Sequence, residues 1–226
     1  MGVEWTRSMA FLREAAGRLR LRREREPIET ADQLAAFVST RSAFVAQKKL
    51  YGYLKARMGT RYPSMFEDDV FIQSINVAKL HVFAACLSDL AVHTVARVGH
   101  AGSLSNEQVA LLASHCFEWG IGDNEAHLPD EGMARSWRDG FAARLRDVHW
   151  ENLAAGGDAF SESPKALFQW APIAENLKRY DQEIVENSIR FAFGEVARDF
   201  RERATLGGIA TDWCRSRMDA EAPAQS

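Results

Sequence analysis

Apolar residues recur every three or four positions along most of the chain, which is the spacing of one buried face of an α-helix. Caps and breakers divide this pattern into segments. We predict helices over residues 4–26, 31–58, 65–98, 106–119, 129–155 and 172–203, a short turn after 163 and one or two helical turns within 211–218. No segment alternates apolar and polar residues for long enough to predict a β-strand. The sequence therefore predicts an all-α protein, a single bundle of six to seven helices.

Polar residues with capping spacing mark three of the predicted helix starts. Thr30 with Gln33, and Ser105 with Gln108, have the spacing of a capping box, in which each side chain bonds the other residue's backbone N–H. Ser163 is followed by a proline, which is typical of an N-cap before the first helical position. These caps agree with the apolar periodicity that follows each of them.

The third predicted helix, residues 65–98, holds the most apolar stretch of the chain. That stretch, residues 77–98, nevertheless contains Lys79, His81, Asp89, His93 and Arg97. An Asp near the middle of a membrane-spanning helix costs about 3 kcal/mol on insertion scales. We therefore predict a long, buried central helix of a soluble core, ended by Gly99.

Charge and a proline divide the chain into three parts. Residues 4–26 carry seven arginines and four glutamates, a net charge of +3, whereas the whole chain carries −3. Five apolar residues of this segment lie on one stripe of a helix, namely Trp5, Met9, Leu12, Ala16 and Leu19, and Pro27 ends the segment. We predict a basic amphipathic helical arm over 1–27, the bundle over 28–205, and a short helix with a disordered tail over 206–226.

The basic arm is the clearest candidate for contact with a partner. An arginine-rich amphipathic helix can lie in a protein groove or on an anionic membrane surface. The predicted partner-contacting residues are Trp5, Arg7, Arg13, Arg18, Arg20, Arg22 and Arg23. In the alternative interpretation, the apolar stripe of the arm docks on the bundle of its own chain.

A polar stripe on the third helix is the best organised candidate for catalysis. At 100° per residue, Lys79, Cys86, Asp89, His93 and Arg97 fall within about 80° of one another. Asp89 lies one turn before His93 and could orient it for acid/base catalysis. Alternatively, the stripe is the solvated edge of the helix, held by the pairs Asp89–His93 and His93–Arg97.

No familiar catalytic or metal-binding motif supports a stronger assignment. Gly-x-Ser-x-Gly, P-loop and Gly-x-Gly-x-x-Gly strings do not occur in the sequence. A second polar cluster lacks the spacing of known metal sites; it consists of His115, Cys116, Glu118, Asp123, Glu125 and His127. We predict no metal and no cofactor.

Composition narrows the class of protein and its surroundings. Hydrophobic residues make up 46% and charged residues 26% of the chain, which is ordinary for a globular protein and excludes a strongly basic nucleic-acid binder. The three cysteines are too few for a disulfide framework, and no segment has the pattern of a secretory signal. These features favour a reducing compartment, the cytoplasm.

Residues 44–92, which include LYGYLKARMGTRYPSMFEDDVFIQSINVAKLHVFAACLSDLAV, resemble a group of short helical proteins from alphaproteobacteria. Some members of that group carry the label esterase. The resemblance implies an all-helical bacterial protein and raises hydrolysis as an activity, but its motifs identify no catalytic residue.

Two hypotheses follow from the sequence. The first is a non-enzymatic interaction, assembly or regulatory protein of the bacterial cytoplasm, which meets a protein partner and could lie at the inner membrane. The second is a small esterase-like hydrolase that uses Asp89 and His93 as an acid/base pair.

Overall fold

The protein is all-α, as the sequence predicts. The structure, a computed structural model, describes residues 26–125 and 131–221, and these form nine α-helices, two short 3-10 helices and no β-strand. The α-helices are α2 (Ala31–Met58), α3 (Asp69–Gly102), α4 (Asn106–Gly122), α5 (Glu131–Asp147), α6 (Trp150–Ala154), α7 (Glu162–Trp170), α8 (Glu175–Lys178), α9 (Gln182–Arg203) and α10 (Leu206–Glu221). The 3-10 helices are η1 (Gly59–Arg61) and η2 (Ser64–Glu67).

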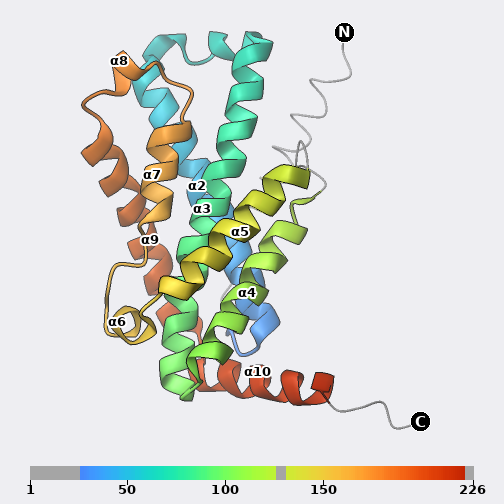
Figure 1. Cartoon of the computed structure of the whole chain (residues 1–226). Helices are drawn as coiled ribbons and strands as arrows, with labels where there is room; N and C mark the ends of the chain where they lie inside the picture. The colour runs from blue at the N-terminus through green and yellow to red at the C-terminus, as the bar shows by residue number, and fades with distance from the viewer. Residues whose placement is uncertain (1–25, 126–130, 222–226) are drawn as a thin grey trace.

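Helix α3 lies at the centre of this arrangement (Figure 1). It packs against α2, α4, α6, α7 and α10, while α9 packs on α7 and α2 at the side of the molecule. The residues of α3 from 82 to 96 are buried on nearly every side of the helix. A helix that is apolar all round must be surrounded by other elements, which explains why it occupies the core.

The observed ends of α3 differ from the predicted ones. The helix begins at Asp69 instead of residue 65 because Asp68 is its N-cap, and the Asp68 Oδ1 accepts from the Val70 N–H at 2.9 Å. It continues to Gly102, and Ser103 ends it in the left-handed conformation with φ 52°. Gly99 lies inside the helix instead of ending it. A glycine is needed at this position because Val109 packs against it, and a Cβ atom on Gly99 would lie 2.4 Å from a Val109 methyl group.

Two of the three predicted caps are confirmed. Thr30 with Gln33 begins α2, and Ser105 with Gln108 begins α4, each as a complete capping box. The prediction for Ser163 is wrong. Helix α7 begins at Glu162, so Ser163 lies in its first turn, and its side chain bonds to α3 instead.

The two longest predicted helices of the C-terminal half are each divided in the structure. The predicted helix over 129–155 is interrupted between Asp147 and Trp150, which separates α5 from α6. The predicted helix over 172–203 is interrupted at residues 179–181, which separates α8 from α9. The second break is held by tertiary contacts, because the Asp181 carboxylate accepts from Tyr53 and pairs with Arg57, both on α2.

The segment before α2 runs beside the end of α9. Ile28 and Ala204 form a parallel β-bridge, in which the Ile28 N–H donates to the Arg203 carbonyl at 2.9 Å and the Thr205 N–H donates to the Ile28 carbonyl at 2.9 Å. The Arg203 Nε also donates to the Glu26 carbonyl at 3.0 Å. We call this set of contacts the clasp.

Helix α10 begins directly after the clasp and crosses the end of α3 (Figure 1). It approaches α3 closely at Gly102, where an added Cβ atom would lie 2.2 Å from the Ala210 Cβ. The missing side chain at Gly102 therefore permits this crossing.

By length and composition, α3 is the one helix of the described chain that could cross a lipid bilayer, and half of its most apolar 18-residue stretch is buried inside the structure. Core helices of soluble proteins share these properties, so the observation assigns no location to the protein.

Candidate functional site

The Asp89 side chain, a predicted catalytic group, lies in the protein interior with a relative exposure of 0%. Its carboxylate connects three helices. The Arg144 Nη1 from α5 donates to Oδ1 at 2.7 Å, and the Ser163 hydroxyl from α7 donates to Oδ2 at 2.6 Å. The Asp89 carboxylate is therefore fully surrounded by donors from other elements.

The same carboxylate caps the N-terminus of α7. The backbone N–H of Ser163 donates to Oδ2 at 2.8 Å, and that of Glu162 donates to Oδ1 at 3.2 Å. A negative charge at this end of a helix satisfies free N–H groups and is stabilised by the helix dipole. Asp89 thus supplies the cap that Ser163 was predicted to provide.

Arg144 completes the network with donors to two further groups. Its Nη1 donates to the Ser88 hydroxyl at 2.7 Å, and its Nη2 donates to the Ala159 carbonyl at 2.7 Å. Complete burial raises the pKa of Asp89, whereas the Arg144 charge and the Ser163 donors oppose that rise. The arrangement holds α3, α5 and α7 together.

The interpretation of the stripe as a solvated edge is therefore wrong for its central members. Cys86 and Asp89 are 0% exposed and His93 is 6% exposed. The predicted pair between His93 and Arg97 is present, with Arg97 Nη1 at 3.1 Å from His93 Nδ1, but the Asp89 carboxylate bonds to Arg144 and α7 instead of His93. The reason is tertiary, because neighbouring helices bring stronger donors than a histidine one turn away.

The geometry around His93 identifies its tautomer. A guanidinium only donates, so the Arg97 contact requires a lone pair on Nδ1 and leaves the ring proton on Nε2. The buried Nε2 has no hydrogen-bond partner within the described part of the chain. Burial and the charges of Arg97 and Arg201 lower the pKa of His93 to about 3. His93 is therefore a neutral, weakly basic side chain.

Burial affects the reactivity of two further members of the stripe, Cys86 and Lys79, in different ways. Burial and the Asp89 charge raise the pKa of the Cys86 thiol, which disfavours the reactive thiolate. Burial lowers the pKa of Lys79 to about 8. Within the described ranges, 26–125 and 131–221, no group of three His, Cys, Asp or Glu side chains could hold a metal ion.

The second polar cluster is dispersed by its contacts. His115 pairs with Asp32 on α2 at 3.0 Å, and Glu118 pairs with Arg138 on α5 at 2.8 Å. Cys116 is buried, and Asp123 accepts from Ser39. These side chains serve different interhelical contacts, and His127 lies outside the described residues.

His81 lies apart from the stripe, as its helical position predicts. Its ring stacks on Trp170 from α7 with centroids 3.5 Å apart, and its Nδ1 accepts from the Trp137 indole of α5 at 3.2 Å. This aromatic cluster joins the same three helices as Asp89 does, nearer to the surface.

The strongest feature that sequence reasoning missed lies on the outside of α8 and α9. The apolar spacing within the helix predicted over 172–203 indicates one buried row, which consists of Leu177, Tyr180, Ile184, Phe191, Val196 and Phe200. Only Val196 and Phe200 are buried, whereas the exposed fractions are 58% for Leu177, 79% for Tyr180, 71% for Ile184 and 73% for Phe191.

The error has a geometric cause. Residues seven apart share a face of a helix, so Ile184 and Phe191 lie on one side of α9. The side that packs against the bundle is different and carries Val185, Ile189, Ala192, Phe193, Val196, Ala197 and Phe200. Helix α9 thus has two apolar faces, and periodicity alone did not identify the buried one.

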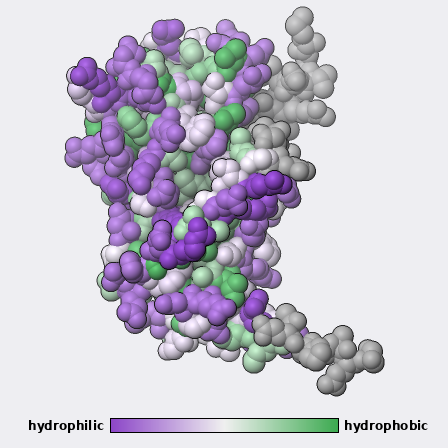
Figure 2. Space-filling view, viewed as in Figure 1, coloured by the Kyte–Doolittle hydropathy of each residue, from purple (hydrophilic) through white to green (hydrophobic). Residues whose placement is uncertain are grey.

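We call the surface that carries Leu177, Tyr180, Ile184 and Phe191 the outer face. Of the nine large apolar side chains exposed in the described chain, these four lie within 15 residues. The side of the molecule seen in Figure 2 is mostly hydrophilic, with hydrophobic residues in separate small groups. Four exposed large apolar side chains within 15 residues are therefore a local concentration of apolar surface on this protein.

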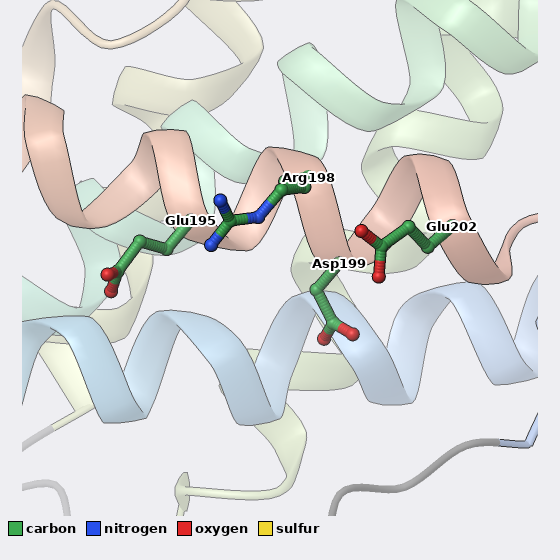
Figure 3. A pocket seen from close by; sticks show the side chains of 4 residues that line it. All are labelled: Glu195, Arg198, Asp199 and Glu202. Carbon is green, nitrogen blue, oxygen red and sulfur yellow. The ribbon is translucent and has the colours of Figure 1, made fainter.

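The outer face becomes acidic toward the C-terminal end of α9. Glu195, Arg198 and Glu202 continue the line of Ile184 and Phe191, and with Asp199 they line a shallow pocket (Figure 3). Three carboxylates and one guanidinium give this pocket a formal charge of −2.

The members of the acidic pocket differ in how far they are already paired. Asp199 points toward α2 in Figure 3 and pairs with Arg41 at 2.9 Å. Glu195 lies 4.0 Å from the Lys48 ammonium, whereas Glu202 has no ion pair with another described residue. Glu195 and Glu202 are thus the carboxylates best able to meet an incoming cation.

All of the predicted partner-contacting residues, Trp5, Arg7, Arg13, Arg18, Arg20, Arg22 and Arg23, lie outside the described residues. Their predicted role stays a prediction.

Comparison with known proteins found no match among protein-family models, curated proteins or solved structures.

Proposed function

We propose that this chain is a non-enzymatic interaction protein of the bacterial cytoplasm that contacts a protein partner through the outer face. The observation that carries the proposal is the group of four large apolar side chains on α8, on α9 and at residue 180 between them, which are 58–79% exposed. Contiguous exposed apolar side chains mark interaction surfaces on soluble proteins. We propose that the described helices form one bundle around α3 and that this bundle presents the outer face to the partner.

The chemistry of the outer face indicates the kind of partner. Its N-terminal part, with Ile184 and Phe191, is apolar, and its C-terminal part, with Glu195 and Glu202, is acidic. An amphipathic helix with apolar side chains at one end and basic ones at the other would complement both parts. We therefore propose a basic amphipathic helix as the partner element.

The hydrolase alternative has less support from the geometry. A general base is most effective with a pKa near the working pH, and it must reach the proton that it removes. His93 is neutral with a pKa of about 3, and the Asp89 carboxylate is buried behind donors from α5 and α7. A substrate could reach Asp89 only if one of these helices moved.

The free thiols are compatible with the proposed compartment. Cys86, Cys116 and Cys214 form no disulfide, and the first two are buried. Reduced cysteines are usual in the cytoplasm. Contact with an anionic membrane through the arm, and the absence of a cofactor, remain predictions from the sequence.

A photo-reactive amino acid at position 184 of the full-length protein tests the proposal in cells. We expect a cross-linked product heavier than the chain, and no such product from position 70, because Val70 is also 71% exposed but lies at the start of α3. The partner found in this way should bind the purified protein. Binding should weaken at least tenfold in Phe191→Asp and remain unchanged in Val70→Asp.

Equal cross-linking from both positions, or equal loss of binding in both variants, would contradict the proposal. A measurable esterase activity that disappears in His93→Gln, with the fold retained, would favour the hydrolase instead.

A further inference from the structure

The outer face has a candidate occupant within the same chain. We propose that residues 4–26 form a helix that lies along the outer face, parallel to α9, and covers it until a partner displaces it. This inference rests on the proposed function to the extent that both assign a binding role to the same surface. It adds a regulatory contact, because the arm and the partner then compete.

The clasp fixes where the arm joins the bundle and from which direction it arrives. The β-bridge between Ile28 and Ala204 is parallel, so the chain entering Ile28 runs in the same direction as the chain leaving α9. The Arg203 Nε holds the Glu26 carbonyl at 3.0 Å, which extends this alignment toward the arm. A chain that continued this alignment before Glu26 would run back along α9 toward its N-terminus.

The lengths of the two helices match. At a rise of about 1.5 Å per residue, an arm helix over 4–26 extends roughly 34 Å from the clasp. Helix α9 has 22 residues and a corresponding length of roughly 33 Å. An arm lying parallel to α9 therefore spans the length of α9, including Ile184 and Phe191, without a reversal of its direction.

The apolar parts of the two surfaces lie at the same distance from the clasp. Phe191 is 12 residues before Arg203, or roughly 18 Å, and Ile184 is roughly 29 Å away. On the arm, Leu12 is 14 residues before Glu26, or roughly 21 Å, and Trp5 is roughly 32 Å away. Leu12 and Trp5 belong to the apolar stripe of the arm, so large apolar side chains meet on both sides.

The charged parts also coincide. Toward the clasp, the apolar stripe of the arm gives way to Arg20 and Arg23, roughly 9 and 5 Å from Glu26. On α9, Glu195 and Glu202 lie roughly 12 and 2 Å from Arg203. Both surfaces thus change from apolar to charged in the same direction, and their charges are opposite.

Disulfide trapping in the full-length protein tests this placement. Ala16 and Gly194 lie roughly 15 and 14 Å from the clasp, so Ala16→Cys with Gly194→Cys should bring two thiols together. A Cβ atom at Gly194 meets no atom within 4 Å, and the substitution leaves Ile184 and Phe191 in place. Cys214 is replaced by Ser in all variants, since it is the free cysteine that is not buried.

The matched control joins Ala16→Cys to Gly140→Cys. Gly140 is an exposed glycine of α5, and a Cβ atom there meets no atom within 4 Å. Helix α5 is separate from α9 in the view of Figure 1. We expect an intrachain disulfide to form at least ten times faster in the 16/194 pair than in the 16/140 pair. Equal rates, or disulfide-linked dimers in place of intrachain bonds, would overturn the proposal; dimers would assign the outer face to a second copy of the chain.

Charge reversal provides an independent readout in the 16/194 background. Glu195→Lys with Glu202→Lys should slow trapping at least threefold, and Arg20→Glu with Arg23→Glu should restore the rate when added to these changes. A rate that these reversals leave unchanged would contradict the proposed register.

The two proposals fail separately. If residues 4–26 do not dock on the outer face of their own chain, the 16/194 pair is not trapped, yet the partner still cross-links to position 184. Without a partner, position 184 gives only intrachain cross-links to residues 4–26, and trapping is retained.

Discussion

Two regions of this protein reverse the usual distribution of side chains. Around Asp89, a carboxylate and a guanidinium lie inside the bundle with donors and acceptors matched across three helices. On the outer face of α9, Ile184 and Phe191 lie more than 70% exposed. The interior region is complete within the described helices, whereas on the outer face these helices leave apolar side chains uncovered.

The difference separates a structural site from the surface that we propose for binding. A buried ion pair with all its hydrogen bonds made adds specificity to the packing of helices but offers little to a ligand. Exposed apolar side chains add little to the stability of the free protein and gain free energy when another surface covers them. We therefore assign Asp89 to the architecture, and the exposed apolar side chains support the proposal that the outer face serves recognition.

The largest effect that distinguishes the two regions is expected at Asp89. Replacing Asp89 with Ala leaves Arg144 largely buried without its partner and the start of α7 without its cap, which should reduce the free energy of unfolding by about 3–5 kcal/mol. Urea denaturation followed by circular dichroism measures this change. The exposed pair of Lys165 with Glu162 is the control, and Lys165→Ala should cost no more than about 0.5 kcal/mol. A loss below about 1 kcal/mol in Asp89→Ala would remove the contrast.

A smaller effect should follow from the buried histidine beside this network. His93 stays neutral in the folded protein because its pKa is lowered to about 3, whereas the unfolded chain takes up a proton near pH 6.5. Stability is therefore fully present above pH 6.5 and falls by roughly 1.4 kcal/mol per pH unit as the pH drops below that value. Measured between pH 6.5 and 5, the loss should be about 2 kcal/mol greater in the wild type than in His93→Gln. Identical pH dependence in both proteins would mean that His93 is protonated in the folded state.

The smallest effect is expected on the outer face, where two phenylalanines of one helix allow a direct comparison. Phe193 is 0% exposed and stacks on Phe160 with centroids 4.5 Å apart, so Phe193→Ala should cost about 3–5 kcal/mol. Phe191 is 73% exposed, and Phe191→Ala should cost no more than about 1 kcal/mol. Thermal and urea denaturation of the two variants measure this difference. Equal losses would show that Phe191 is a core residue and would end its assignment to recognition.

The sequence predicted those features that depend on neighbouring residues. The all-α class and the capping boxes at Thr30 and Ser105 are confirmed because the signals lie within one helical turn. The predicted ends of α3 were wrong by four residues at each end. At the N-terminal end Asp68 caps the helix, and at the C-terminal end Gly99 serves packing against Val109 instead of ending the helix.

The features that were missed depend on residues distant in the chain. The burial of Asp89 requires Arg144 and Ser163, which follow it by 55 and 74 positions, and no local pattern relates these three residues. The break between α8 and α9 requires contacts of Asp181 with α2. The error at Ile184 and Phe191 has a different cause, since α9 carries two apolar faces and only packing against the bundle determines which of them is buried.

The cap that Asp89 provides to α7 has a consequence for the time course of folding. Helix α7 has nine residues, fewer than the roughly 12–15 that an isolated helix needs in water. Its first N–H groups are satisfied by a residue 73 positions earlier, so the local chain alone does not stabilise its first turn. We therefore expect α7 to become helical only after α3 has formed and the intervening chain has closed on it. Its amide protons should gain protection from hydrogen exchange later than those of α2 and α4, whose capping boxes lie within their own sequences.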